Sequence, residues 1–296
     1  MVDGWFRASD GIRLKYQIYG TGPAIVIANG LGGSFPAWKF IVESFKDRFT
    51  FYSWDYRGLF ESEKPTDISS ITVDAQTQDL IELLDFWKIE SAIFAGWSYG
   101  GQVIVDLYSK KPEVFNGIVF LNAMVGSASD SQSIPSVLLP LYDRFLSLWS
   151  LGWKFLKPVA GRAVSSGIFL TFVKNTGLVA SELDEDIFEE MALKFILLDH
   201  EIFQATLLSA QNFTGIQILE TITVPCMVIA GTRDFVVLPS SSRIIASKIP
   251  QCQLKLIKNT SHYSAVEKPA EVVACFNEYL NSLNQIKGYN ENITHQ

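Results

Sequence analysis

Cysteine and histidine are scarce in this sequence, and their scarcity excludes several kinds of site. The 296 residues include three cysteines and three histidines. The cysteines are Cys226, Cys252 and Cys275. Because their number is odd and no pair has CxxC spacing, we expect no disulfide framework but reduced thiols that serve packing, as in a cytoplasmic protein. No His/Cys cluster has metal-ligand spacing, so we expect no metal ion.

Positive charge, long apolar runs and phosphate-binding motifs are also lacking. The 24 Lys and Arg residues face 31 Asp and Glu residues, and this net charge of −7 argues against a nucleic-acid partner. The most apolar region, 134–156, is interrupted by Asp143 and Arg144, whereas a membrane span needs about 20 apolar residues in a row. The first residues contain no apolar signal segment. With no GxGxxG or P-loop pattern, we expect no cofactor.

What the chain does contain is an alternation of short apolar runs with helical patterns. The runs occupy residues 24–29, 49–55, 92–97 and 117–124. Such runs are typical of strands in a parallel sheet that is covered on both faces. Between them, residues 72–89 carry leucines at helical spacing after a capping Thr72, and Pro112 ends a second helical pattern. The alternation predicts an α/β fold with a mostly parallel central sheet flanked by helices.

The pattern changes between residues 127 and 220, where no strand is predicted. We expect helices there over 133–150, 152–174 and 184–213, the last broken near His200. Strands return at 226–231 and 254–258, and a helix follows at 269–283. The predicted organisation is an α/β core of residues 1–126 and 221–284, a helical cap insertion of 127–220 and a loose tail of 285–296.

One serine has the surroundings of a catalytic nucleophile. Ser98 lies in the stretch Gly96-Trp97-Ser98-Tyr99-Gly100, which follows a predicted strand and opens a predicted helix. A GxSxG motif in this context is typical of a nucleophile elbow, where the serine backbone is strained and small neighbours avoid clashes. The alternative is a structural turn that happens to contain serine.

A serine nucleophile needs a base and an acid that orients it. His262 lies in a loop after the strand at 254–258, whereas His200 lies in the insertion and His295 in the tail. Asp234 comes just after the strand at 226–231, so the chain order is Ser98, Asp234, His262. An oxyanion also needs two donors. We expect these to be the backbone N–H groups of Tyr99, after the nucleophile, and of Leu31, in the glycine-rich loop NGLGGS at 29–34.

Taken with their order, these motifs resemble the α/β-hydrolase superfamily, of the type with an inserted helical cap. The resemblance rests on the stretches NGLGG (29–33), DYRG (55–58), GWSYGG (96–101) and GTRD (231–234), followed by the His262 loop. It implies a helical cap after the sixth strand. In two places the chain departs from the family pattern: Asn29 stands where relatives often have histidine, and Phe60 replaces a glycine. We expect Phe60 to face the pocket mouth.

The resulting hypothesis is a serine hydrolase that cleaves carboxylic esters of apolar acyl groups through an acyl-enzyme. A thioester or C–C bond hydrolase with the same residues remains an alternative, and so does a non-catalytic small-molecule-binding protein on this fold. Some enzymes of this fold use an aspartate in the elbow as nucleophile, and the serine found here excludes their type of reaction.

The cap region also raises the question of what it binds. Its apolar side chains either pack the cap onto the core or line an acyl pocket over Ser98. They are Leu138, Leu139, Leu141, Phe145, Trp149, Trp153, Phe155, Phe169 and Phe172. Basic residues of the same region would allow contact with an anionic membrane, but we favour a solvated face. They are Arg144, Lys154, Lys157, Arg162 and Lys174.

Overall fold

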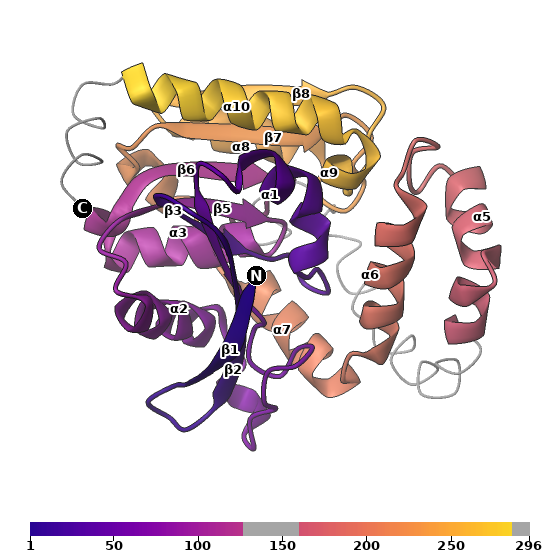
Figure 1. Cartoon of the computed structure of the whole chain (residues 1–296), viewed down its shortest axis with the longest axis horizontal. Coiled ribbons are helices and arrows are strands. Elements are labelled where there is room, and N and C mark those ends of the chain that lie inside the picture. The colour runs from indigo at the N-terminus through magenta and orange to yellow at the C-terminus, as the bar shows by residue number, and fades with distance from the viewer. Residues whose placement is uncertain (127–159, 286–296) are drawn as a thin grey trace.

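The computed structural model describes residues 1–126 and 160–285, built around an eight-stranded sheet (Figure 1). The strand order is β1-β2-β4-β3-β5-β6-β7-β8; β2 runs antiparallel to both neighbours, and the strands from β4 to β8 pair in parallel. The strands are β1 (Val2–Arg7), β2 (Arg13–Gly20), β3 (Ala24–Ala28), β4 (Thr50–Trp54), β5 (Ala92–Trp97), β6 (Phe115–Leu121), β7 (Cys226–Gly231) and β8 (Cys252–Ile257). The mostly parallel sheet is therefore confirmed.

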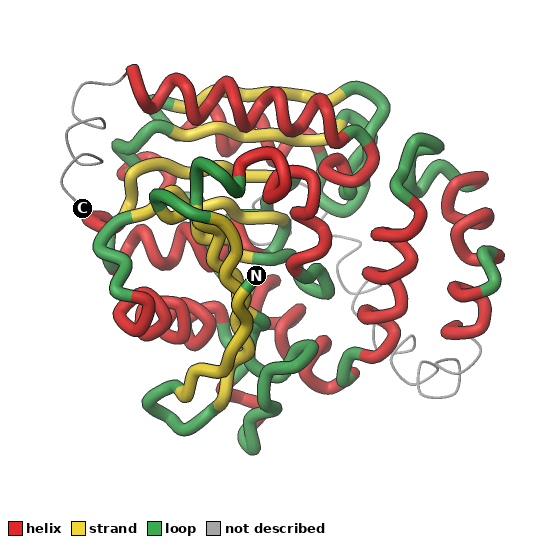
Figure 2. Tube along the Cα trace, in the orientation of Figure 1, coloured by secondary structure: helices red, strands yellow, loops and turns green. Residues whose placement is uncertain are grey.

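Helices cover both faces of this sheet (Figure 2). One face carries α1 (Lys39–Phe45) and α10 (Pro269–Gln285), and the other carries α2 (Val73–Trp87), α3 (Gly100–Lys110) and α8 (Pro239–Lys248). Residues in β3 alternate between the two cores, with Ile25 and Ile27 facing α1 and Val26 facing α3. A strand buried on both faces has no polar side, which explains its unbroken apolar run.

The predicted helix at 72–89 is confirmed as α2, with the expected cap. The Thr72 side chain accepts a hydrogen bond from the Ala75 N–H at 3.0 Å, and Leu80, Leu83 and Leu84 are buried against the sheet. Four short 3-10 helices lie in the connections between these elements, within the described residues. They are η1 (Phe35–Trp38), η2 (Ile68–Ser70), η3 (Pro112–Val114) and η5 (Ile218–Thr221).

Helices also fill the described part of the insertion between β6 and β7. They are α5 (Ile168–Asn175), α6 (Glu185–Leu197) and α7 (His200–Asn212). Figure 1 shows α5 and α6 side by side, apart from the sheet. The expected break near His200 is confirmed, because Asp199 caps α7 with hydrogen bonds from two backbone N–H groups. The helix expected over 133–150 lies outside the described residues.

The helix expected over 152–174 is wrong in its described part. Residues 160–165 are helical, but the chain turns at Gly167, whose φ of 73° is left-handed, before α5 begins. Glycine adopts this conformation without the steric cost that a Cβ would bring, so it separates the two helices.

The N-terminal strands β1 and β2 form a hairpin with mixed polarity, which the search for fully apolar runs does not detect.

All three cysteines are free. Within the described residues, no helix is both long and apolar enough to cross a membrane. Of the basic residues that the sequence analysis named between β6 and β7, Lys174 pairs with Glu185 at 2.5 Å, whereas Arg144, Lys154 and Lys157 lie outside the described residues.

Candidate active site

Ser98 stands on a strained turn between β5 and α3. Its φ is 52°, in the left-handed region that non-glycine residues rarely occupy. Its two flanking glycines are required by space. A Cβ on Gly100 would overlap the carbonyl oxygen of Ala28, and one on Gly96 would lie 2.9 Å from the Gly100 backbone. The motif therefore forms the sharp strand–turn–helix elbow that its sequence predicts.

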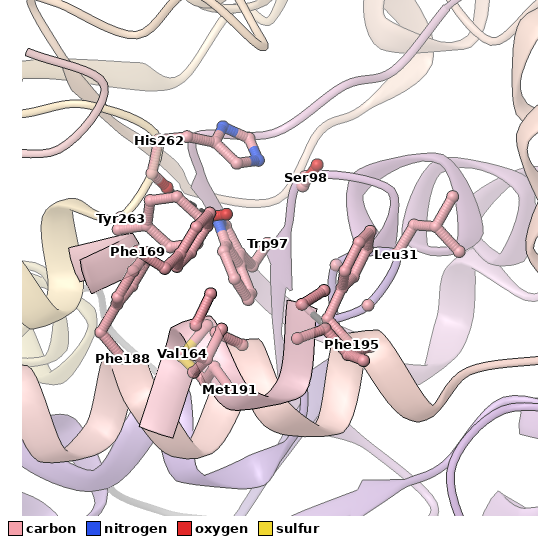
Figure 3. Close-up of a pocket in the computed structure, with 16 residues that line it drawn as sticks. Leu31, Trp97, Ser98, Val164, Phe169, Phe188, Met191, Phe195, His262 and Tyr263 are labelled. Atoms are coloured by element: carbon pink, nitrogen blue, oxygen red, sulfur yellow. Dashed lines mark hydrogen bonds between the residues drawn. The ribbon is translucent and has the colours of Figure 1, made fainter. Parts of the chain in front are cut away.

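His262 and Asp234 meet although 28 positions separate them. The Nδ1 atom of His262 lies 2.8 Å from Oδ2 of Asp234, and both side chains are buried. Because a carboxylate only accepts hydrogen bonds, Nδ1 donates, and Nε2 of the neutral ring is left as an acceptor. Figure 3 shows the His262 ring beside the Ser98 side chain on the same pocket wall. The structure thus brings together the three side chains that the sequence analysis singled out.

The Asp234 carboxylate is held on both oxygens. Oδ1 accepts the backbone N–H groups of Val236 and Val237, each at 2.8 Å. Oδ2 accepts the Asn122 side-chain amide at 2.9 Å in addition to His262. These donors orient the carboxylate so that one lone pair of Oδ2 faces the imidazole.

Asn122 is a site residue that the sequence analysis missed. It follows β6 and has a φ of 44°. Its amide also donates to the Ser261 carbonyl at 3.2 Å, and its oxygen accepts the Ser264 hydroxyl at 2.5 Å. A polar residue directly after an apolar strand, at the same sheet edge as Ser98, was the available signal.

Trp97 fixes the backbone of the His262 loop. Its indole N–H donates to the His262 carbonyl at 3.1 Å, and the two rings lie 5.6 Å apart. A Cβ on Gly33 would overlap the indole ring, so the glycine-rich loop approaches Trp97 closely. Trp97 therefore links the Ser98 elbow, the His262 loop and the loop of 29–34.

Asn29 has a structural role in the glycine-rich loop. Its side-chain amide donates to Ser53 Oγ at 3.0 Å, and its oxygen accepts the Trp38 indole N–H at 3.0 Å. These bonds anchor the loop to β4 and η1. Leu31, one of the two expected oxyanion donors, lies at the pocket beside Ser98. Tyr99, the other, is buried directly after Ser98.

A pocket of about 400 Å³ opens next to Ser98 and is walled mainly by apolar side chains (Figure 3). One face of α6 forms much of the wall, with residues at i, i+3, i+4, i+7 and i+8. They are Phe188, Met191, Ala192, Phe195 and Ile196. Helical residues 160–165 contribute Ala160, Ala163 and Val164, and α5 contributes Phe169. Phe172 instead points to solvent with 57% of its surface exposed.

Two tyrosines beside the site stay protonated at neutral pH. Burial raises the pKa of the Tyr263 hydroxyl to about 12, and the charges of Asp234 and Glu267 act in the same direction. Burial also raises the pKa of Tyr99 far above its usual range. A phenol that stays protonated cannot accept another proton, so neither hydroxyl can act as a general base at neutral pH.

Phe60 does not lie where the sequence analysis expected it. It lines a second cavity of about 620 Å³, together with Asp55 and Lys194, rather than the pocket at Ser98. Its φ of 48° is in the left-handed region, which glycine occupies without steric cost. Within residues 1–126 and 160–285, no group of three or more acidic, His or Cys side chains is placed to hold a metal ion.

Comparison with known proteins agrees with this architecture. The family model described as the alpha/beta hydrolase fold matches residues 23–269. The chain is 25% identical over 262 residues to 3-oxoadipate enol-lactonase 2 of Acinetobacter baylyi, covering 87% of this chain and 89% of that protein.

Solved structures resemble the whole fold. An esterase of Rhodococcus sp. matches with a TM-score of 0.78 at 20% identity, covering 96% of this chain and all of the esterase. The enol-lactonase of Burkholderia xenovorans matches with a TM-score of 0.73 at 21% identity, covering 94% and 100%. At these identities the likeness concerns the fold alone. Together with the family match over residues 23–269, it establishes that the chain belongs to the α/β-hydrolase fold family.

Proposed function

We propose that this protein is a serine hydrolase that cleaves carboxylic esters of apolar acyl groups through an acyl-enzyme. One observation carries the proposal: Ser98, on a strained elbow, lines the same apolar pocket as His262, whose Nδ1 is hydrogen-bonded to the buried Asp234. A nucleophile, a base and an acid that orients the base are the groups that acyl transfer requires.

In the proposed reaction, Ser98 Oγ attacks the ester carbonyl while Nε2 of His262 takes the hydroxyl proton. Asp234 holds the Nδ1 proton and stabilises the imidazolium that forms. His262 then returns the proton to the departing alcohol. In the second half, water attacks the acyl-enzyme with His262 again as base, and Ser98 regains its proton as the acid leaves.

The developing oxyanion is assigned to the backbone N–H groups of Leu31 and Tyr99. Tyr99 stands at the N-terminal end of α3, where helical N–H groups favour negative charge. Leu31 belongs to the loop that Asn29 and Trp97 anchor, so its backbone is fixed before substrate arrives. Such preorganised donors lower the barrier without reorganisation during the reaction.

The apolar pocket supports the acyl preference. The side chains from α5, α6 and helical residues 160–165 would contact an acyl chain whose carbonyl lies at Ser98. We propose that these segments belong to a cap that spans residues 127–220. Because a lactone is a cyclic ester, the same residues can open one, and the similarity to enol-lactonases makes lactones the second class to test. Thioester and C–C bond cleavage remain alternatives with the same groups.

The test combines labelling with turnover. A fluorophosphonate probe is expected to attach to Ser98, located by peptide mass spectrometry, and p-nitrophenyl esters from acetate to decanoate are expected to be hydrolysed. Ser98→Ala should lose about 10⁴–10⁶ in rate. A protein that binds these esters without labelling or turnover would be the non-catalytic binding protein instead. Near-wild-type turnover by Ser98→Ala would reject Ser98 as the nucleophile.

A further inference from the structure

Glu267, the last residue of α9 (Ser264–Glu267), is a buried carboxylate that the proposed reaction does not use. Only 1% of its surface is exposed. Oε2 accepts the Ser261 backbone N–H at 2.6 Å, and Oε1 accepts the Ser261 hydroxyl at 2.6 Å and the Ala180 backbone N–H at 2.8 Å. Among the described residues it forms no salt bridge, so these three donors are what compensates its burial.

The partners of Glu267 belong to two parts of the molecule. Ser261 directly precedes His262, so a bond to its N–H acts on the backbone that carries the base. Ala180 lies 87 positions away, in the segment that connects α5 to α6. One carboxylate therefore ties the loop of the proposed base to the helical insertion.

A second contact fixes the same segment to α9. The Asp184 N–H donates to the carbonyl of Val266 at 2.9 Å, and the Asp184 side chain caps α6 through the Ile187 N–H at 3.0 Å. The start of α6 is thus attached to α9 next to Glu267. Since α6 supplies much of the pocket wall, a shift of α9 would move that wall and the His262 loop together.

We propose that Glu267 is a positioning residue that holds the His262 loop and the α6 wall of the acyl pocket in a fixed arrangement relative to each other. The proposal rests on the proposed function of the Ser98 site. Through Ser261 it places the imidazole of His262, and through Ala180 it places the N-terminal end of α6. Alignment of the base therefore depends on the same carboxylate as the shape of the pocket.

The main variant is Glu267→Gln, which keeps the shape of the side chain. An amide has one acceptor oxygen and one NH₂ group, so in either orientation a backbone N–H of Ser261 or Ala180 faces another donor. Ser261→Ala is a milder variant that keeps both backbone bonds of Glu267 and removes only the bonds of the Ser261 hydroxyl, to Glu267 at 2.6 Å and from the Tyr263 N–H at 3.4 Å. Glu271→Gln is the matched control, because Glu271 is half-exposed and pairs with Lys268 on the surface.

Hydrogen exchange tests the link without relying on activity. In Glu267→Gln, peptides that cover 178–184 and 258–263 should both exchange faster, while Glu271→Gln leaves them unchanged. Faster exchange in one segment alone, or in neither, would show that Glu267 does not couple the two parts. This outcome is readable even if the wild-type protein neither labels with fluorophosphonate nor hydrolyses esters, the result that would refute the proposed function itself.

Kinetics test the consequence. We express kcat relative to the concentration of sites that react with fluorophosphonate. On this basis Glu267→Gln should lower kcat about 10- to 100-fold, as displacement of a catalytic group by about 1 Å does. Its preference for long over short p-nitrophenyl esters should fall in parallel, whereas Ser261→Ala should lower kcat and keep that preference. A merely structural role would reduce the number of competent sites and the melting temperature, yet leave kcat per site and the chain-length profile unchanged. That result would overturn the proposal.

Discussion

Replacing Asp234 by asparagine would test the proposed base and its acid with the least change in shape. Oδ1 of Asp234 faces two backbone N–H donors, at Val236 and Val237. Oδ2 faces the Asn122 amide and His262 Nδ1. The amide oxygen of the variant should keep the Oδ1 position, where two fixed donors await it, so its NH₂ group turns toward His262.

This orientation reverses the hydrogen bond that sets the tautomer. A donor at the Oδ2 position forces Nδ1 to accept, and the proton of the neutral ring moves to Nε2, which can no longer take one from Ser98. Loss of the correct tautomer is expected to lower kcat about 10⁴-fold, equivalent to about 5 kcal/mol in the barrier. The NH₂ group also meets the Asn122 amide, and leaving a buried donor unpaired costs about 1–3 kcal/mol of stability.

The assay is hydrolysis of a p-nitrophenyl ester at saturating substrate, with thermal unfolding measured in parallel. Asp74→Asn is the control, since Asp74 is exposed and pairs with Lys110 at the surface. Turnover within tenfold of wild type in a folded Asp234→Asn protein would refute the reasoning and require another carboxylate partner for His262. If the variant lost activity because it had unfolded, the melting curve would show this.

Three other perturbations follow from the geometry. Each added acyl methylene should raise kcat/KM about fourfold, at roughly 0.8 kcal/mol per CH₂, until the pocket is full; Ala192→Phe on the pocket wall should move the optimum to shorter chains, and a series that declines from acetate would reject an acyl pocket. Burial raises the pKa of Asp55 to about 6, so the folded state holds this proton more tightly than the unfolded chain, and stability is lost as pH rises from about 4 to 7. Urea unfolding should show Asp55→Asn gaining up to about 3 kcal/mol over wild type across that range, and a difference independent of pH would contradict it. Gly100→Ala should destabilise the fold by about 1–3 kcal/mol because its Cβ overlaps the backbone of β3, whereas Gly161→Ala, with open space around the Cβ, should not; equal melting temperatures would disprove the steric argument.

Much of the core could be predicted because its signals are local. The apolar runs at 24–29 and 92–97 became buried strands, and the capped leucine pattern after Thr72 became α2. The elbow around Ser98 is also readable locally, as a GxSxG pattern between a strand and a helix, although the close neighbour of Gly100 is the Ala28 backbone in β3. The order of Ser98, Asp234 and His262 along the chain is readable without any coordinates.

Other features were missed because their local patterns are ambiguous or were interpreted by analogy. Gly167 breaks a helix whose composition looks continuous, and the half-polar strands of the N-terminal hairpin do not have the apolar pattern of the central ones. Phe60 was placed by analogy with a motif, but the fold of its loop turns it toward the second cavity.

The sequence by itself determined the apolar strands of the sheet, the capped helix α2, the strained serine and the residue types of the proposed reaction. Only the tertiary structure decided which side chains surround them. The amide of Asn122 reaches Asp234 across 112 positions, and Glu267 reaches Ala180 across 87. No periodicity encodes such contacts, because they arise where parallel strands end at one edge of the sheet and where the insertion packs against α9. A residue's spacing along the chain fixes its local conformation, whereas its hydrogen-bond partners depend on how distant elements pack together.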